Sequence, residues 1–573
     1  MKRLLLLLIV LTACAGMLFA GAQGEASAEG DYKLNEPGKW PVVLGDEMYE
    51  IDALGIYSAT EATGKLQEAE FTQYLEDVTN VRLTWTEIVE SASFAERQNL
   101  ILASGDLPDV IMSAWHMSAQ QAYTYGLNGT LVKLNDLIDT KMPDLKKELN
   151  AYPQYLAQLT SPDGGIYALP DLEAGCFHCS MSAKFFIYKP WVEKLGLEWP
   201  PETTEDLYEM LVAFRDGDPN ENGKKDEIPL MGSAAGGWNT NPIIYLMNSF
   251  IYTNNGTGGG FLQRDDGKIT FVANTNEWRE GLKYQAMLVQ EGLLSPETYV
   301  QHNDNLRALV EHPDAPMVGS VAAGWFGVFS INDGPSRRFA DYWPISPLEG
   351  PNGVQFSRYS SPAVRFHTKI TDAAERPDII AQWANWFYQD RMVNGSLSGS
   401  FRQEGIDWRY LTEDEKKLGL VSRDGTPAET LPLKTITYGL GAEKHDAGWT
   451  RAAPRWTPYN VGGLPLEWKD DRSKQEYWLM IWTRDLMQPY KPEQKYIPPN
   501  LVFDETVMDE MTDLNEAIAS GTGVVMQWAT EFIVGNKDID SDGEWQNYLT
   551  ELERAGLDRY VELWQDTITN AGY

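Results

Sequence analysis

Pro108-Asp109-Val110-Ile111-Met112 is the short apolar stretch that decides the fold of this chain. It follows a predicted helix that begins at a capping box of Ser93 and Glu96, runs to Ala103 and stops at Ser104-Gly105. The stretch is too short for a helix and its residues favour burial, so it predicts a buried strand. A helix followed directly by a buried strand is typical of α/β proteins.

The residues before this stretch show the same alternation. Residues 71–78 place apolar side chains at i, i+3, i+4 and i+7, which predicts an amphipathic helix. Residues 81–85 alternate apolar and polar side chains, which predicts a strand. Helices and strands in alternation, joined by short turns, predict a parallel sheet wound by right-handed crossovers.

The pattern recurs farther along the chain. Residues 185–188 predict a strand, and residues 191–195 predict a short helix. Thr203 or Thr204 is expected to cap a helix with apolar positions between 207 and 214. Further helices are predicted at residues 278–288, 377–388 and 545–568. Two α/β lobes, each built from more than one chain segment, are the simplest architecture that accounts for this order.

The composition excludes some functions. The chain has 573 residues, with 47 Lys and Arg against 83 Asp and Glu, which gives a net charge of −36. A nucleic-acid or anionic-membrane binder needs clustered basic residues, so this charge argues against both. It also favours a neutral or weakly charged ligand over a polyanion, although Arg337, Arg338, Arg402 and Arg455 leave an anionic ligand open. The 20 Trp and 27 Tyr supply many flat rings suited to sugars.

The N-terminus predicts export. Lys2 and Arg3 precede an apolar run, and residues 1–22 have the form of a secretory signal peptide. Cleavage after Ala20 or Ala22 fits the change in polarity better than the alternative, a lipobox ending at Cys14. That alternative would anchor the protein to lipid. No other stretch of about 18 apolar residues is present to span a membrane.

Cys176 and Cys179 flank Phe177 and His178 and are the only cysteines left after the signal peptide. In an exported protein such a pair is a small disulfide, a redox motif or half of a metal site. A zinc site needs four ligands, and this segment supplies three. A local disulfide or two inert thiols is therefore the favoured interpretation.

Several stretches, spread over most of the chain, together match one family in order. They are residues 103–111, 163–170, 218–229, 280–284 with 291–293, 532–535 and 555–558. In these stretches the chain resembles the large extracellular solute-binding proteins of ATP-driven sugar importers, and more narrowly their alginate- and oligosaccharide-binding subgroup. No single stretch is specific, but the ordered set is.

The resemblance implies a periplasmic-binding-protein-like type II fold, in which two α/β lobes joined by a hinge hold a sugar in the cleft between them. The first lobe is expected at about 40–171 plus 356–400. The second is expected at about 172–355 plus much of 401–573. The implied partners are an oligosaccharide and the membrane subunits of an ABC permease, and we expect a monomer.

Tryptophans are the candidate ligand-binding residues. Ligands of open α/β sheets bind beyond the carboxyl ends of strands, and Trp115 lies in such a loop, next to His116, which we expect to make local hydrogen bonds. Trp238 and Trp325 lie between glycines that leave a ring accessible. Trp408 and Trp456 are further candidates. The alternative for each of the five is ordinary packing, because most of the 20 Trp must be buried.

A calcium site is predicted in residues 218–227. Oxygen donors at alternate positions of a tight loop, with a Gly at the turn, are what Ca²⁺ requires. The candidate ligands are Asp218, Asn220, Asn222, the backbone carbonyl of Lys224, Asp226 and Glu227. Pro229 occupies the twelfth position, where an EF-hand has Glu, so the resemblance implies that Asp226 and Glu227 supply that charge. The alternative is a simple Asn/Asp turn.

A second acidic loop, residues 538–543, also alternates carboxylates. Position twelve is Leu549, and the resemblance implies no metal there. We expect an acidic, solvated loop that caps the helix beginning near Trp545.

These observations predict a binding protein, not an enzyme. A secreted glycoside hydrolase is the main alternative, but its two carboxyls cannot be identified among 83 acids. Signatures of serine hydrolases, P-loop proteins, zinc proteases and dinucleotide-binding proteins are absent from the sequence. A peptide or lipid binder of the same fold is the third possibility, because fold does not determine ligand.

Overall fold

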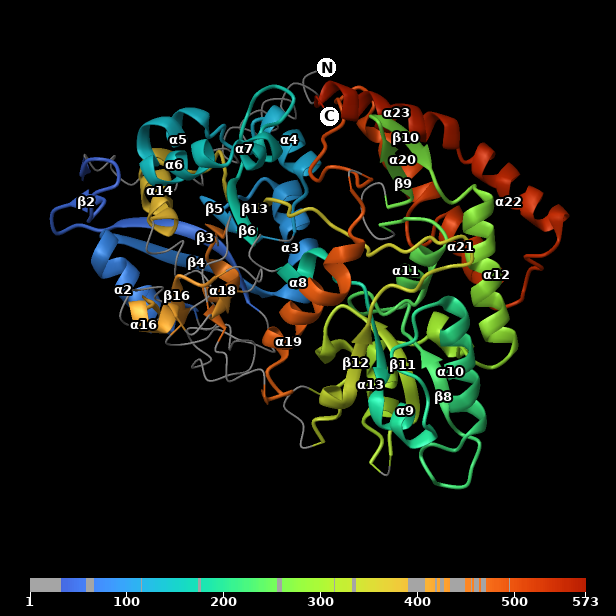
Figure 1. The fold of residues 1–573 in the computed structure, drawn as a ribbon. Helices are drawn as coiled ribbons and strands as arrows, with labels where there is room; N and C mark the ends of the chain where they lie inside the picture. Colours follow the sequence, from blue (N-terminus) through green and yellow to red (C-terminus); the bar gives the residue numbers. More distant parts are fainter. Residues whose placement is uncertain are drawn as a thin grey trace, which may run out of the picture.

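Two α/β lobes form the computed structural model of this protein (Figure 1). A six-stranded sheet lies in the first lobe and a four-stranded sheet in the second. The structure describes residues 32–57, 66–114, 116–173, 177–254, 260–313, 315–331, 336–389, 408–417, 420–422, 427–432, 449–454, 456–457, 463–464, 470–493 and 495–572. Among them, no helix is both long enough and apolar enough to cross a membrane.

The first sheet has the strand order β17-β6-β13-β5-β3-β4. Its strands are β3 (Tyr49–Tyr57), β4 (Val81–Glu90), β5 (Val110–Met112), β6 (Leu169–Glu173), β13 (Arg365–Ile370) and β17 (Trp456–Thr457). β3 pairs in parallel with β4 and β5, as the alternation of helix and strand predicts. β13 is antiparallel to both β5 and β6, so the prediction of an all-parallel sheet is wrong there. The reason is that β13 enters from the second lobe instead of following a helical crossover within the first.

The helices of the first lobe largely follow the predicted pattern. They are α2 (Glu70–Thr79), α3 (Ser91–Ser104), α4 (Ala119–Leu127), α5 (Asn135–Lys141), α6 (Pro143–Ala151), α7 (Pro153–Leu159) and α14 (Pro377–Ala384). The prediction of a capping box at Ser93 is wrong, because α3 begins at Ser91, directly after β4. Ser93 and Glu96 therefore lie inside the helix.

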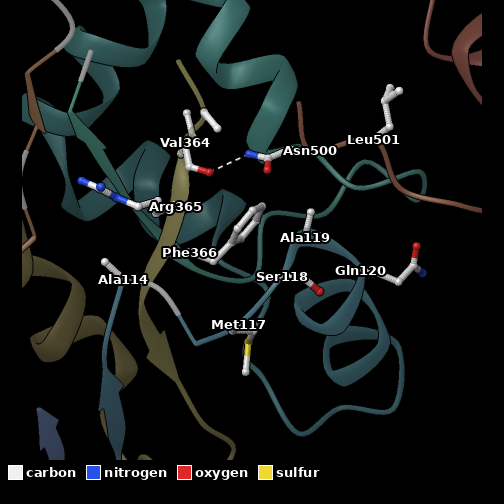
Figure 2. Close-up of a pocket in the computed structure, with 11 residues that line it drawn as sticks. Ala114, Met117, Ser118, Ala119, Gln120, Val364, Arg365, Phe366, Asn500 and Leu501 are labelled. Atoms are coloured by element: carbon white, nitrogen blue, oxygen red, sulfur yellow. Dashed lines mark hydrogen bonds between the residues drawn. The ribbon is translucent and has the colours of Figure 1, made fainter. Parts of the chain in front are cut away.

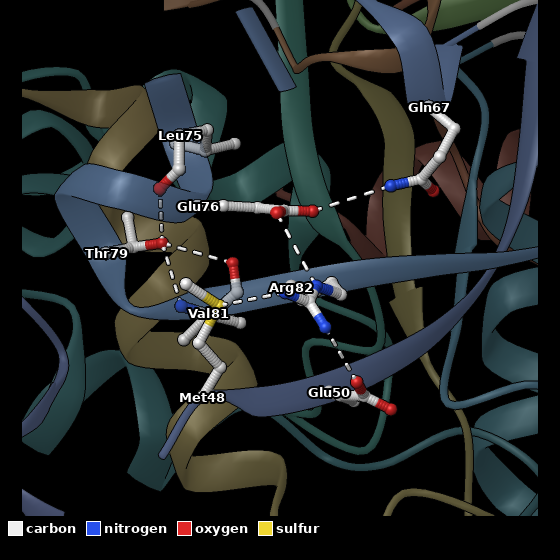
Figure 3. A network of polar contacts seen from close by, with 8 residues as sticks. All are labelled: Met48, Glu50, Gln67, Leu75, Glu76, Thr79, Val81 and Arg82. Carbon is white, nitrogen blue, oxygen red and sulfur yellow. Dashed lines mark hydrogen bonds and ion pairs between the residues drawn. The ribbon is translucent and has the colours of Figure 1, made fainter. Parts of the chain in front are cut away.

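Polar contacts fix α2 against its neighbouring strands (Figure 3). Arg82 on β4 forms ion pairs with Glu76 of α2 at 3.5 Å and with Glu50 of β3 at 3.2 Å. The Thr79 hydroxyl donates to the Leu75 carbonyl at 2.6 Å, within the last turn of α2. The turn from helix to strand is thus fixed by side chains as well as by the apolar face of α2.

The second sheet has the order β12-β7-β11-β8. Its strands are β7 (Lys184–Tyr188), β8 (Ile228–Met231), β11 (Val318–Ala323) and β12 (Tyr342–Ile345), and its helices include α9 (Lys189–Leu195), α10 (Thr204–Asp216) and α13 (Asn303–Val310). β8 and β11 are parallel, whereas β7 is antiparallel to both β11 and β12. Thr203 caps α10 in a capping box with Asp206, which confirms the predicted start of this helix.

C-terminal helices share a core with elements from the middle of the chain. α20 (Met508–Ile518), α21 (Val524–Ile533), α22 (Asp542–Arg554) and α23 (Leu557–Asn570) pack with α12 (Asn276–Gln290) and the hairpin β9 (Leu262–Asp265) and β10 (Lys268–Phe271). The helix predicted at 545–568 is divided in two at Gly556, whose φ of 92° a helix does not adopt.

The segment around α18 (Trp449–Ala452) packs into the hydrophobic core of the first lobe. Trp449 and Trp456 are fully buried there, although the predicted division assigned much of 401–573 to the second lobe. The predicted boundary at residue 400 lies outside the described residues. The other short elements are β1 (Lys33–Leu34), β2 (Val43–Leu44), α8 (Phe177–Ser180), α11 (Ile243–Leu246), β14 (Trp408–Tyr410), α16 (Glu413–Lys416), β15 (Val421–Ser422), β16 (Thr430–Pro432), β18 (Gly463–Leu464) and α19 (Gln475–Trp482).

Candidate functional site

Two crossing segments join one edge of each sheet. The first crossing segment leads from β6 to β7, and the second, residues 346–364, leads from β12 to β13. Because β13 is antiparallel to β5 and β6, it begins at the edge where they end. Because β7 is antiparallel to β11 and β12, it likewise begins where they end. Both segments therefore connect the carboxyl ends of β5 and β11, the edges at which open α/β sheets bind ligands.

Trp238 lies at this edge of the second sheet, after β8. This residue is 38% exposed, which is unusual among the tryptophans that the structure describes. The Gly324 N–H donates to the Trp238 carbonyl at 2.7 Å, and a Cβ on Gly324 would lie 2.5 Å from the indole. Glycine at position 324, which follows β11, thus lets the ring lie flat against the backbone. His178, on the first crossing segment, packs beside this ring, and the two ring centroids are 6.1 Å apart.

A polar network surrounds the backbone of Trp238. The next residue, Asn239, is buried and has a left-handed φ of 58°. Its amide donates to the Ser182 hydroxyl at 2.7 Å and accepts from the Arg358 guanidinium at 2.9 Å. Ser182 lies on the first crossing segment and Arg358 on the second. The exposed ring is therefore connected to both segments by its neighbour.

Trp325 lies shortly after β11, but it is only partly exposed. Its ring packs against the apolar cluster that includes Phe186 and Phe326. Part of one ring face is thus taken up by the second lobe. Its role in ligand binding stays a prediction.

A cavity of about 320 Å³ lies at the opposing edge of the first sheet (Figure 2). It is between the start of β13 and the start of α4, beyond the carboxyl end of β5. Its wall is mostly apolar and includes Met117, Ser118, Gln120, Val364, Phe366 and Asn500. Asn500 donates to the Val364 carbonyl at 2.6 Å, so a third part of the chain closes the cavity. The sequence indicated the loop after Ile111, but no local signal indicated the contribution of Asn500.

The structure places the remaining predicted tryptophans differently. Trp456 is fully buried, and its indole N–H donates to the Glu148 carboxylate at 2.9 Å, an arrangement that favours a packing role. Trp115 and the side chain of Trp408 lie outside the described residues. His116 makes the local hydrogen bond that was predicted, since its Nδ1 lies 2.5 Å from the Ser113 hydroxyl.

The predicted calcium loop connects α10 to β8. Asp218, Glu221 and Gly223 have positive φ angles of 47°, 57° and 71°, so the chain turns tightly three times. The side-chain oxygens of Asn220 and Asn222 accept from the N–H groups of residues 222 and 224, at 3.0 and 2.8 Å. These turns gather the predicted ligands within one short loop.

Two carboxylate oxygens of this loop are buried without a hydrogen-bond partner: Oδ1 of Asp218 and Oε1 of Glu227. Burial and the charges of Asp218 and Asp226 raise the pKa of Glu227, because its ionised form has too little compensation. Hydrogen bonds from Asn220 and Asn222 lower the pKa of Asp226. Buried oxygens and uncompensated negative charge are what a bound cation would satisfy, so the residues fit Ca²⁺.

The loop needs more than carboxylates to hold a metal. Among the described residues, no group of three or more His, Cys, Asp or Glu side chains is arranged to bind an ion. A site here therefore depends on amide and carbonyl oxygens, which calcium accepts and zinc does not favour.

In the second acidic loop, residues 538–543, an arginine of the protein compensates the negative charge. Arg279 donates to the carbonyls of Ile539 and Asp540, both at 3.0 Å, and to the Asp542 carboxylate at 2.8 Å. The Ser541 hydroxyl accepts from the Glu544 N–H and caps α22. The prediction of an acidic loop that caps this helix is confirmed.

Cys179 is disulfide-bonded, so its thiolate is not available to a metal. Its predicted partner, Cys176, lies outside the described residues, and the pairing stays a prediction. His178 between them is buried and packs beside Trp238.

Comparison with known proteins gives consistent matches. A model of the family described as bacterial extracellular solute-binding protein matches residues 58–393, more than half of the chain. The fructooligosaccharide ABC transporter substrate-binding protein FusA of Streptococcus pneumoniae serotype 4 is 28% identical over 97% of this chain and 96% of its own length. Lipoprotein LipO of Bacillus subtilis is 26% identical over 85% of this chain and 83% of its own.

Solved structures show the same fold. FusA in complex with kestose has a TM-score of 0.68 and 25% identity, covering 91% of this chain and 99% of that one. An EF-hand mutant of FusA in complex with fructo-nystose also has a TM-score of 0.68, at 24% identity and the same coverage. The alginate-binding protein AlgQ2 without calcium ion has a TM-score of 0.64 and 19% identity, covering 93% of this chain and 100% of that one.

Proposed function

The chain belongs to the bacterial extracellular solute-binding protein family, and we propose that it binds an oligosaccharide between its two lobes and delivers it to an ABC permease. The protein acts as a monomer and does not alter the sugar covalently. Binding stabilises the closed arrangement of the lobes, because the ligand contacts both only when they are closed. The permease then distinguishes the closed form from the open one.

One observation carries this proposal: the exposed Trp238 and the cavity beside Phe366 lie at the two sheet edges that the crossing segments connect. A sugar placed between them meets an aromatic ring from one lobe and a concave, mostly apolar wall from the other. Ser118, Gln120 and Asn500 place polar side chains in that wall. This combination of a few polar groups on an apolar surface is typical of small-molecule sites.

The first candidate ligand is a neutral fructooligosaccharide. FusA, which matches nearly the whole chain, is a fructooligosaccharide-binding protein. The net charge of −36 supports a neutral sugar, since a polyanion such as alginate would be repelled at low salt.

We further propose that residues 218–227 bind Ca²⁺ through Asp218, Asn220, Asn222, the Lys224 carbonyl, Asp226 and Glu227. The ion would supply the positive charge that the buried oxygens of Asp218 and Glu227 lack. Its role is structural, because the loop joins α10 to β8 and contains none of the proposed ligand-binding residues. The EF-hand of FusA supports this assignment.

The family is extracellular, so the chain is an exported protein. LipO, a lipoprotein, supports a lipid anchor at Cys14, whereas the polarity of the sequence supports cleavage after Ala20 or Ala22. The intact mass of the exported protein decides between them. A diacylated Cys14 adds the mass of the lipid to a chain that begins at residue 14.

The experiment that tests the binding function is a thermal-shift and calorimetry panel with kestose, nystose and an alginate oligosaccharide. We expect kestose and nystose to bind saturably and to be recovered intact, and the alginate fragment not to bind. Shorter products after incubation would establish a hydrolase instead. No response to any saccharide would overturn the proposal.

A variant tests the site itself. Trp238→Ala removes the exposed ring and should weaken kestose binding by at least about tenfold, as truncation of an aromatic contact usually does. Tyr410→Ala is the matched control, because Tyr410 is also an exposed aromatic residue but lies on the small β14–β16 sheet. Equal affinities for both variants would remove Trp238 from the site.

A further inference from the structure

Arg358 occupies a junction between parts of the chain that are far apart in sequence. Its Nε donates to the backbone carbonyl of Asn254 at 2.8 Å and to the Asn254 side-chain oxygen at 2.9 Å. Its Nη1 donates to Asn239 at 2.9 Å and to Ser182 at 3.1 Å. One guanidinium on the second crossing segment thus bonds to the first crossing segment and to two loops of the second lobe.

Asn239 links the bonds of Arg358 to the backbone of the preceding residue, Trp238. Asparagine is among the few residues other than glycine that adopt a left-handed conformation at low cost, so at Asn239, with φ 58°, its side-chain bonds can select this conformation from others of similar energy. The bonds to Arg358 and Ser182 hold it. The backbone direction at Trp238, and with it the orientation of the indole, therefore depends on Arg358.

The two crossing segments are also fixed to each other beside Arg358. The Ser360 N–H donates to the Ser180 carbonyl at 2.8 Å, and His178, two residues before Ser180, packs against the Trp238 ring. A rotation of the crossing segments would change the contacts of both Arg358 and His178 with the loop that carries Trp238.

The acceptors of Arg358 are all neutral: a carbonyl, two amide oxygens and a hydroxyl. By contrast, Arg365, the first residue of β13 directly after this segment, forms an ion pair with the buried Asp171 of the first lobe. A guanidinium paired with a carboxylate makes a stronger and more fixed contact than one bonded to neutral oxygens. The Arg358 junction is therefore better suited to rearrange, whereas the Arg365 pair is suited to hold.

We propose that Arg358 is a positioning residue that couples movement of the crossing segments to the orientation of Trp238, so that lobe closure and formation of the aromatic platform occur together. Only the expected effect of this coupling on ligand affinity rests on the proposed function. The mechanical link itself is a property of the protein without ligand.

The first test uses hydrogen exchange and no ligand. Arg358→Lys keeps the charge but loses the planar fork that reaches several acceptors at once. We expect the amides of Gly324 and Ser360, which bond to the carbonyls of Trp238 and Ser180, to exchange about tenfold faster in this variant. Asn239→Gly, which keeps the backbone conformation but removes the link, should have the same effect at Gly324.

Arg338→Gln is the matched control, because Arg338 donates to the second-lobe carbonyls of Val310, at 3.0 Å, and His312, and among the described residues its side chain forms no hydrogen bond with either crossing segment. It should leave the exchange of Gly324 and Ser360 unchanged. Unchanged exchange in both Arg358→Lys and Asn239→Gly would overturn the coupling, whatever the ligand is.

The second test measures kestose affinity and melting temperature together. We expect Arg358→Lys to weaken kestose binding by about tenfold while Arg338→Gln, at a similar loss of thermal stability, binds normally. Normal binding by Arg358→Lys would overturn the proposed consequence for the platform. If the unsubstituted protein does not bind kestose, the assigned ligand is wrong. The hydrogen-exchange experiment still tests the coupling in that case.

Discussion

Residues 218–227 and residues 538–543 both place oxygen-bearing side chains at alternate positions, but the surrounding protein compensates their negative charge to different extents. In the second loop, Arg279 bonds to Asp542 and to two loop carbonyls, and Lys283 lies 3.2 Å from Asp540. In the first loop, oxygens of Asp218 and Glu227 are buried without a partner. Lys194 of α9 pairs with Glu221 at 3.0 Å and donates to the Pro219 carbonyl at 2.9 Å, but it does not satisfy these two oxygens. The first loop therefore keeps buried carboxylate oxygens that a calcium ion would satisfy, whereas Arg279 already bonds to the acidic end of the second loop.

Removing and restoring calcium should reveal the largest difference in stability between variants of the two loops. Adding Ca²⁺ to chelator-treated protein should raise the melting temperature by several degrees, since ligand at about a hundred times its dissociation constant adds about 2.7 kcal/mol. Asp218→Asn or Glu227→Gln should abolish this rise, and Asp542→Asn should keep it. Differential scanning calorimetry measures all four proteins. A full calcium response in Asp218→Asn would show that the two loops do not differ in this way.

The second loop should depend on Arg279 instead. Arg279→Ala removes bonds to three loop oxygens and the contact with the Trp545 ring at 5.5 Å, so we expect a loss of about 2 kcal/mol in the free energy of unfolding. Calcium should not restore it. Lys417→Ala is the control, because Lys417 and its partner Asp414 are both largely exposed and such pairs contribute little. Urea unfolding with and without calcium distinguishes these outcomes.

The pH dependence of stability should differ in sign between the loops. The pKa of Glu227 is raised by burial and by Asp218 and Asp226, so in metal-free protein its contribution is complete below the unfolded pKa and is lost as the pH rises. The pKa of Asp542 is lowered by its hydrogen bond from Arg279, so its contribution is present at neutral pH and is lost on acidification.

Urea unfolding in chelator between about pH 2 and pH 7, a range that extends below the ordinary pKa of Asp, measures both contributions when Glu227→Gln and Asp542→Asn are compared with the unchanged protein. Glu227→Gln should gain relative stability as the pH rises, and Asp542→Asn should lose it. The same trend for both variants would contradict the comparison.

The sequence predicted elements whose signals are local. Thr203 and Asp206 lie three residues apart, and their capping box forms as expected. The antiparallel entry of β13 could not be predicted, because its direction depends on where the chain returns from the second lobe. The capping box at Ser93 failed since β4 passes into α3 without a loop.

The candidate site could be predicted only in part for the same reason, because contacts between residues far apart in sequence leave no local signal. The sequence predicts both Trp238 and Trp456 as ligand-binding residues, yet one is exposed and the other fully buried. The partner that holds Trp456 inside, Glu148, is 308 residues away in sequence. Arg358, which joins four segments, gave no local signal at all. Residue type and flanking residues indicated the kind of ligand, whereas the position of each ring depends on long-range packing.

The smallest expected effect concerns the cap of the second loop. Ser541 accepts the Glu544 N–H at the start of α22, so Ser541→Ala should cost about 1 kcal/mol and leave the calcium response intact. Thr203→Ala is the matched variant, because Thr203 caps α10, the helix that leads into the first loop, and its reciprocal bonds with Asp206 should make its loss larger. If Ser541→Ala changed the calcium response, loop 538–543 would be involved in metal binding, and the contrast between a loop neutralised by Arg279 and a loop neutralised by calcium would fail.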